Sequence, residues 1–279
     1  MSRPALHKAG PSGPPDIRRH IFAGRLDQVL NAVLRAEAAG VVSGLERSRE
    51  LARQLGLELA SGLREGQEVA AGAELARLRG NPLQMTQAEE TLIGALSKAS
   101  GIATAARRAQ ALAGPRLRVV AGGVKKMPPE MKGLVRRAIV HGGAAVRMAE
   151  HPFVYLDKNY VRMLGGIKEA LRAAEGLEGG RIIQVRGETG PLEREALEAV
   201  QHGASLIMVD TGDQEDLRRV SRALSQAGLR GRVQLAFAGE IRLEDLPELA
   251  KLDLDAVDIG YAIVDAPCLP LRLDVLRET

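Results

Sequence analysis

Short apolar runs alternate with amphipathic segments of helix length through the second half of the chain. Six runs have the length of a buried strand, at 117–120, 153–156, 181–186, 205–210, 232–236 and 256–260. Helical segments separate them, at 129–140, 161–174, 192–202, 215–227 and 243–252. This alternation is typical of βα units on a parallel sheet. Six evenly spaced units predict a six-stranded α/β barrel.

The first hundred residues follow a different pattern. Strands are predicted over 28–42, broken by Ala-Ala-Gly at 38–40, and over 57–63 and 74–78, with a helix at 45–55. Thr86, followed three residues later by Glu89, has the spacing of a capping box and predicts a helix that runs to about residue 99. Residues 100–104 interrupt this pattern before a further helix, which contains Arg108.

These patterns predict an N-terminal α+β domain over 17–104 and the α/β barrel over 105–264. Residues 1–16 contain four prolines and two glycines and are predicted to be a flexible tail. Residues 265–279 are expected to pack back on the N-terminal domain as a closing strand.

Composition limits the partners. The chain has 39 Lys and Arg against 35 Asp and Glu, with no basic tract, only three Tyr and three Phe, and no Trp, which argues against a nucleic-acid partner. No apolar run could span a bilayer and no secretory signal is recognisable, so no membrane partner is expected. Cys268, the lone cysteine, cannot form an internal disulfide, and a reducing cytoplasm fits.

Asp210 ends the predicted strand at 205–210, an apolar run that closes with this carboxylate. In parallel sheets, open or closed, ligands bind beyond the carboxyl ends of the strands. Asp210 is therefore a candidate site residue. The alternative is a solvated strand-end carboxylate or a helix cap.

Several sequence blocks resemble one enzyme family. They are Ala88-Glu89-Glu90-Thr91, Ser100-Gly101-Ile102-Ala103-Thr104, Gly142-Gly143 with Arg147, Val209-Asp210-Thr211, Ala238-Gly239-Glu240-Ile241, Asp258-Ile259-Gly260 and 266–275. The blocks are similar to those of quinolinate phosphoribosyltransferase, also called carboxylating nicotinate-nucleotide pyrophosphorylase. The resemblance implies the type II phosphoribosyltransferase fold, an N-terminal α+β domain beside a six-stranded α/β barrel.

The resemblance also implies an activity. The family transfers phosphoribose from phosphoribosyl pyrophosphate to quinolinate, with Mg²⁺ on the pyrophosphate and a site completed by a neighbouring subunit, so Mg²⁺ and a homodimer or higher homo-oligomer are expected. It implies catalytic roles for Lys126, Arg147 and Asp210, a metal role for Asp210, and substrate-binding roles for Arg108, Lys125, Lys132, Lys158, Arg186, Gly239 and Gly260. Converging Lys and Arg suit an anionic ligand, and a carboxylate suits the metal.

This sequence departs from the family pattern in the charges of the expected site. Lys125-Lys126 stand for Arg-Lys, Glu90 stands for an arginine, Val146 stands for a histidine, and two inward-facing acids become Gln184 and Arg186. A reversed charge would repel a carboxylate of quinolinate. Two hypotheses follow: an enzyme that presents phosphoribosyl pyrophosphate to an aromatic nitrogen acceptor other than quinolinate, or a non-catalytic binding or partner protein. Arg186 has its own alternative, a structural ion pair with Glu90 or Asp157.

Overall fold

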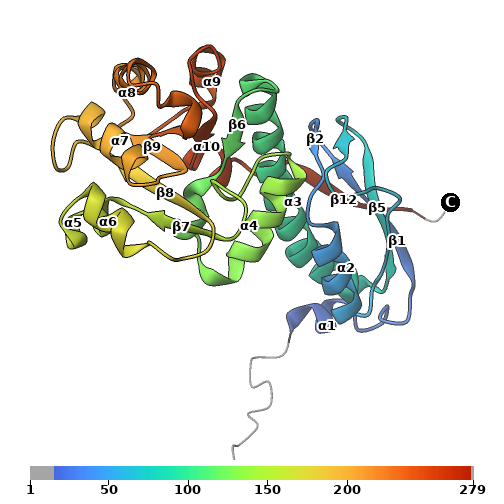
Figure 1. Cartoon of the computed structure of the whole chain (residues 1–279). Coiled ribbons are helices and arrows are strands. Elements are labelled where there is room, and N and C mark those ends of the chain that lie inside the picture. Colours follow the sequence, from blue (N-terminus) through green and yellow to red (C-terminus); the bar gives the residue numbers. More distant parts are fainter. Residues whose placement is uncertain (1–15, 278–279) are drawn as a thin grey trace, which may run out of the picture.

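The computed structural model describes residues 16–277 of the 279-residue chain. Its larger part is a six-stranded sheet with the strand order β6-β11-β10-β9-β8-β7, in which every pair is parallel. The strands are β6 (Arg118–Val120), β7 (Phe153–Leu156), β8 (Gly180–Val185), β9 (Leu206–Asp210), β10 (Gln234–Ala238) and β11 (Ala256–Asp258). Helices follow the strands and cover the sheet (Figure 1).

Side chains alternate between two cores along these strands. Ile182, Leu206, Met208, Ala236 and Ala256 form an inner core, whereas Ile183, Val185, Ile207, Val209, Leu235, Phe237 and Val257 pack against the helices in a larger outer core. Burial on both faces explains why the strands are continuous apolar runs. Ala145, just before β7, bridges to β6 and lies beside the inner core, so the segment before β7 closes the barrel against β6. The predicted fold class is confirmed.

The covering helices are short. They are η1 (Gly122–Lys126), α4 (Pro129–His141), α5 (Lys158–Leu164), α6 (Ile167–Ala173), α7 (Leu192–Gln201), α8 (Gln214–Gln226), η2 (Arg230–Arg232), η3 (Leu243–Asp245), α9 (Leu246–Leu249) and α10 (Tyr261–Val264). The single helix predicted at 161–174 is wrong, because Gly165 and Gly166, both with positive φ, separate α5 from α6. The segment predicted as helical over 243–252 contains only η3 and α9.

The N-terminal part contains a four-stranded antiparallel sheet with the order β12-β1-β5-β3. Its strands are β1 (Leu30–Ala36), β3 (Glu58–Ala60), β5 (Glu74–Gly80) and β12 (Leu271–Val275), beside a β2 (Gly40–Val41) and β4 (Glu68–Val69) pair and helices α1 (Ile17–Ile21) and α2 (Leu45–Gln54). The C-terminal strand β12 thus lies beside β1, far from it in sequence (Figure 1). The tail predicted over 1–16 lies outside the described residues except for Asp16.

One 32-residue helix, α3 (Pro82–Ala113), runs between the two parts of the molecule (Figure 1). Its N-cap is Asn81, whose side chain accepts the Gln84 N–H at 2.9 Å, while the Gln84 side chain accepts the Asn81 N–H at 2.7 Å. The predicted cap at Thr86 is wrong, because the Thr86 hydroxyl donates to the Leu83 carbonyl inside the helix. The predicted break at 100–104 is also wrong, and the domain boundary drawn at residue 104 falls within α3.

None of the helices within residues 16–277 combines the length and the apolar character that crossing a membrane requires.

Candidate functional site

The inward-facing positions of the barrel strands become polar at the carboxyl ends. Gln184 follows Ile182 two residues along β8, Asp210 follows Met208 on β9, and Asp258 follows Ala256 on β11. Because strand side chains alternate, these residues continue the inner face and meet above the inner core. They line one cavity of about 1600 Å³.

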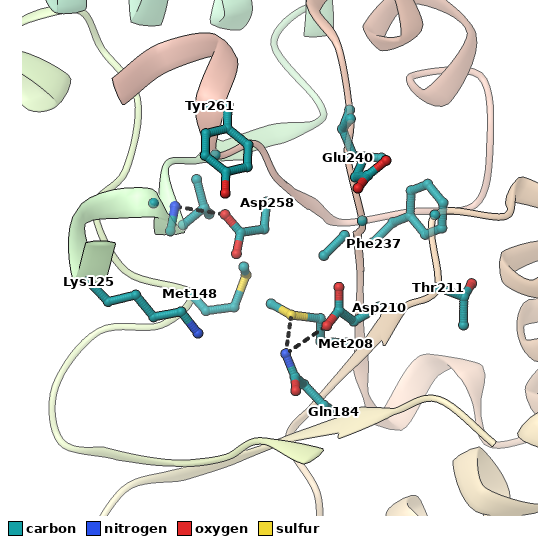
Figure 2. A pocket seen from close by; sticks show the side chains of 18 of the residues that line it. Lys125, Met148, Gln184, Met208, Asp210, Thr211, Phe237, Glu240, Asp258 and Tyr261 are labelled. Carbon is teal, nitrogen blue, oxygen red and sulfur yellow. Dashed lines mark hydrogen bonds between the residues drawn. The ribbon is translucent and has the colours of Figure 1, made fainter. Parts of the chain in front are cut away.

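The strand order divides the cavity by charge. The segments after β6 and β7 and the segment before β7 supply Lys125, Lys126, Lys158 and Arg147, which we call the cationic wall. The ends of β9, β10 and β11 and the loops after them supply Asp210, Asp213, Glu240, Asp245 and Asp258, which we call the acidic wall, and also Arg242, which lies 3.7 Å from Asp245. Figure 2 shows Lys125 across the cavity from Asp210 and Glu240. A ligand that fills the cavity would therefore meet opposite charges at its two ends.

The cationic wall is anchored at the start of η1. The Gly122 N–H donates to Asp258 Oδ1 at 2.7 Å, and a Cβ at position 122 would overlap the Asp258 carboxylate. Lys126 Nζ donates to the Tyr261 hydroxyl at 2.6 Å and lies 4.0 Å from the centroid of its ring. Lys125 and Lys126 are exposed, so their ammonium groups can reach a ligand.

Gln184 connects three sides of the cavity floor. Its Oε1 accepts the Lys158 N–H at 2.9 Å, and its Nε2 donates to the Tyr155 hydroxyl at 2.9 Å and to Asp210 Oδ2 at 3.1 Å. Figure 2 shows its contact with Asp210. Burial, with the negative charges of Asp258 and Asp210, raises the pKa of Tyr155. Tyr155 therefore remains a neutral hydroxyl, and it donates to Met208 Sδ at 3.2 Å.

Arg186 lies beside this network and pairs with the same carboxylate. Its NH1 is 2.7 Å from Asp210 Oδ2, and its Nε is 3.9 Å from Glu188 Oε1. Glu188 in turn accepts two hydrogen bonds from Arg162, at 2.7 and 2.8 Å. The ion pair proposed for Arg186 with Glu90 or Asp157 is thus not the one formed, since its partner is Asp210 and Glu90 pairs with Arg18.

The carboxyl group of Asp258 lies at the end of β11, beside the start of η1. Burial raises its pKa and the charge of Asp210 adds to the rise, whereas the Gly122 N–H, Lys125 and Lys126 oppose it. An aspartate normally ionises near pH 4. An acid whose pKa is raised by folding stabilises the protein at low pH, and this contribution is lost as the pH rises through the raised value.

Asp258→Asn is therefore expected to stabilise the protein more at pH 8 than at about pH 4. Asparagine keeps an oxygen for the Gly122 N–H but carries no charge to desolvate. Urea unfolding at the two pH values measures the difference, with the exposed Asp265→Asn as the control. An equal effect of Asp258→Asn at both pH values would contradict this prediction.

Most of the site residues named from the sequence line the cavity. They are Lys125, Lys126, Arg147, Lys158, Arg186, Asp210, Gly239 and Gly260. Arg108 on α3 and Lys132 on α4 do not line it. Gly239 has a φ of 113°, and a Cβ there would overlap the backbone of Gly212, so its role includes the close approach of two loops.

The sequence did not single out several residues of the cavity, among them Tyr155, Tyr261, Asp213 and Asp245, nor Glu195, which lies behind it. Tyr155 is one strand alternation beyond Phe153, a signal that could have found it. Glu195 lies on the buried stripe of α7 with Leu192, Ala196 and Ala199, and an acid on such a stripe is a signal for a buried hydrogen-bond role. For Tyr261, which follows Gly260, the sequence pattern offers no signal.

The residues present do not fit the magnesium ion that the resemblance implies. Mg²⁺ is usually bound by one or two carboxylates together with substrate phosphates and water, but the Asp210 Oδ2 atom already accepts from the Arg186 cation at 2.7 Å and from Gln184 at 3.1 Å. Within residues 16–277, no three His, Cys, Asp or Glu side chains gather to hold a metal. We derive no step through this ion.

Comparisons with known proteins agree with this architecture. Residues 16–100 match the family described as "Quinolinate phosphoribosyl transferase, N-terminal domain", and residues 102–274 match the corresponding C-terminal domain. The chain therefore belongs to the quinolinate phosphoribosyltransferase family, as the sequence blocks predicted.

Individual relatives are distant. The chain is 26% identical over 250 residues to a probable nicotinate-nucleotide pyrophosphorylase [carboxylating] of Archaeoglobus fulgidus, covering 89% of this chain and 95% of that protein. It is 28% identical over 249 residues to the human nicotinate-nucleotide pyrophosphorylase [carboxylating], covering 88% and 82%. The solved nicotinate-nucleotide pyrophosphorylase of Francisella tularensis shares the fold, with a TM-score of 0.80 and 22% identity over 94% of this chain and 90% of that one.

Proposed function

We propose that this protein is a phosphoribosyltransferase that uses phosphoribosyl pyrophosphate and an aromatic nitrogen acceptor other than quinolinate, and that it acts as a homodimer. The observation that carries the proposal is the cationic wall, which gathers Lys125, Lys126, Arg147 and Lys158 at one side of the cavity. Membership of the family supports the reaction class, and so does the activity for which its relatives are named, nicotinate-nucleotide pyrophosphorylase.

The two walls suit different parts of the donor. Charge-assisted hydrogen bonds from ammonium and guanidinium groups to phosphate oxygens contribute about 1.5–3 kcal/mol each. When the acceptor nitrogen bonds to the ribose carbon and pyrophosphate leaves, negative charge develops on the leaving group, and fixed cations stabilise it. The carboxylates of Glu240 and Asp258 can accept hydrogen bonds from ribose hydroxyls.

The acidic wall argues against quinolinate as the acceptor. Quinolinate carries two carboxylates, and the carboxyl groups of Asp210, Glu240 and Asp258 also line the cavity. Arg186, which replaces an acid of the family pattern, is already paired with Asp210. An acceptor with fewer negative charges avoids this repulsion.

Replacing Lys126 by alanine should weaken binding of phosphoribosyl pyrophosphate about tenfold or more, because one charge-assisted contact is lost. Isothermal titration calorimetry measures the change, and Lys251→Ala, outside the cavity, is the matched control.

The acceptor and the oligomeric state are tested separately. No nicotinate mononucleotide should form from quinolinate, and light scattering should show at least a dimer.

These three measurements test the acceptor, the dimer and the binding of the donor separately. Ordinary turnover of quinolinate would show that the acceptor is wrong, and a monomer at micromolar concentration would contradict the dimer. If the donor does not bind the parent protein, or if Lys126→Ala has no effect, the alternative of a non-catalytic binding or partner protein takes its place.

A further inference from the structure

The Asp210 carboxylate, which a metal ion would need as a ligand, is bound instead to the guanidinium of Arg186. Arg186 NH1 donates to Asp210 Oδ2 at 2.7 Å, and Gln184 Nε2 donates to the same oxygen at 3.1 Å. The Asp210 side chain is 20% exposed and that of Arg186 is 33% exposed, so the pair is only partly accessible to water. A cation that binds Asp210 would have to displace Arg186 or bind beside its positive charge.

Arg186 is held in this place by a buried carboxylate behind it. Glu195 on α7 is 2% exposed, and its Oε2 accepts the N–H groups of Arg186 at 3.1 Å and of Gly187 at 2.8 Å. Its Oε1 accepts the Thr189 N–H at 2.6 Å and the Thr189 hydroxyl at 3.0 Å. The loop that carries Arg186 is thus held by three backbone N–H groups and one hydroxyl, and the guanidinium is preorganised beside Asp210.

Asp258, which also faces inward at the end of its strand, is bound to the backbone. Asp258 accepts the Gly122 N–H, and the backbone of Gly122 is packed against its carboxylate. The Arg186 fork, by contrast, keeps donors for a ligand: among the described residues its NH2 donates no hydrogen bond, and its Nε is 3.9 Å from the nearest oxygen of Glu188. Planar guanidinium forks match phosphate oxygens well.

We propose that the Arg186 guanidinium takes the place of the divalent metal in this protein, so that a diphosphate group binds to the cationic wall and Arg186 without a metal ion. The ligand class rests on the proposed function. The replacement of the metal rests only on the contacts of Arg186 and Asp210.

The first test uses Mn²⁺ alone, followed by electron paramagnetic resonance, and needs no substrate. The parent protein should show no Mn²⁺ site that Asp210→Asn removes. Arg186→Glu should create a site at least tenfold tighter than any in the parent, and adding Asp210→Asn to that variant should remove it. Mn²⁺ binding by the parent that falls tenfold on Asp210→Asn would overturn the proposal.

The second test uses inorganic pyrophosphate in calorimetric titrations, once with EDTA and once with Mg²⁺. The parent should bind with the same affinity within about twofold, and Arg186→Gln should lose tenfold or more in EDTA. Arg194→Gln, an exposed arginine on α7 outside the cavity, is the control. Binding that requires Mg²⁺ would overturn the proposal.

Failures of the two proposals are distinguishable. Metal-independent binding of pyrophosphate without any phosphoribosyl transfer would leave the role of Arg186 standing and contradict the proposed function. Absence of pyrophosphate binding under both conditions would overturn the ligand half of the proposal, while the Mn²⁺ titration would still decide the metal half.

Discussion

Replacing Gly101 by alanine is expected to lower the free energy of unfolding by about 2 kcal/mol. Gly101 is in the middle of α3, and a Cβ there would overlap the carbonyl oxygen of Pro267 and press on Cys268. The C-terminal segment cannot easily retreat, because Leu269 exchanges hydrogen bonds with Ser97. Overpacking of this kind costs about 3 kcal/mol, and the better helix propensity of alanine offsets about 1 kcal/mol.

The same helix offers a matched control. Gly94 is exposed on α3, and a Cβ there meets nothing within 4 Å. Gly94→Ala should therefore raise the free energy of unfolding by up to about 1 kcal/mol, through helix propensity alone. Urea unfolding of the two variants should give opposite signs. Equal stabilities would mean that the C-terminal segment does not pack on α3 as described.

Replacing Glu195 by alanine is expected to lower the free energy of unfolding by about 3 kcal/mol and to free the loop that carries Arg186. The substitution removes a buried acceptor from three backbone N–H groups and one hydroxyl. Net losses of about 1 kcal/mol for each hydrogen bond, reduced where water can replace the carboxylate, give this magnitude.

Glu198→Ala on the same helix is the control, since its carboxylate makes no hydrogen bond among the described residues. Urea unfolding measures stability, and hydrogen exchange of the Gly187 and Thr189 amides reports the loop directly. Exchange should accelerate at least tenfold in Glu195→Ala. If both variants behave alike in both measurements, Glu195 does not hold the loop.

The apolar runs were sufficient to place the barrel strands. A parallel strand buried on both faces must be apolar at nearly every position, so the segments that became β8, β9 and β10 are recognisable without any tertiary information. Alternation then determined which side chains face inward, and it correctly placed Gln184 and Arg186 in the cavity. The sequence blocks and their order along the chain also predicted the family, which the two family matches confirm.

Other features depended on contacts between distant segments. Ser100, Gly101 and Thr104 suggest a helix break, yet α3 continues through them. Ser100 donates to the Ser43 carbonyl, Thr104 accepts the Val41 N–H, and Gly101 admits the C-terminal backbone. Small and polar residues, which weaken an isolated helix, here allow close packing on both parts of the molecule.

The pairing of charged side chains in the site likewise depended on the fold. From the sequence, Asp210 was a carboxylate available to a metal, and Arg186 was a substrate-binding residue or the ionic partner of Glu90 or Asp157. Only the adjacency of β8 and β9 brings the two within 2.7 Å, and only the packing of α7 places Glu195 under the loop of Arg186. Sequence spacing determines which face of an element a side chain occupies, whereas its ionic partner depends on which elements become neighbours.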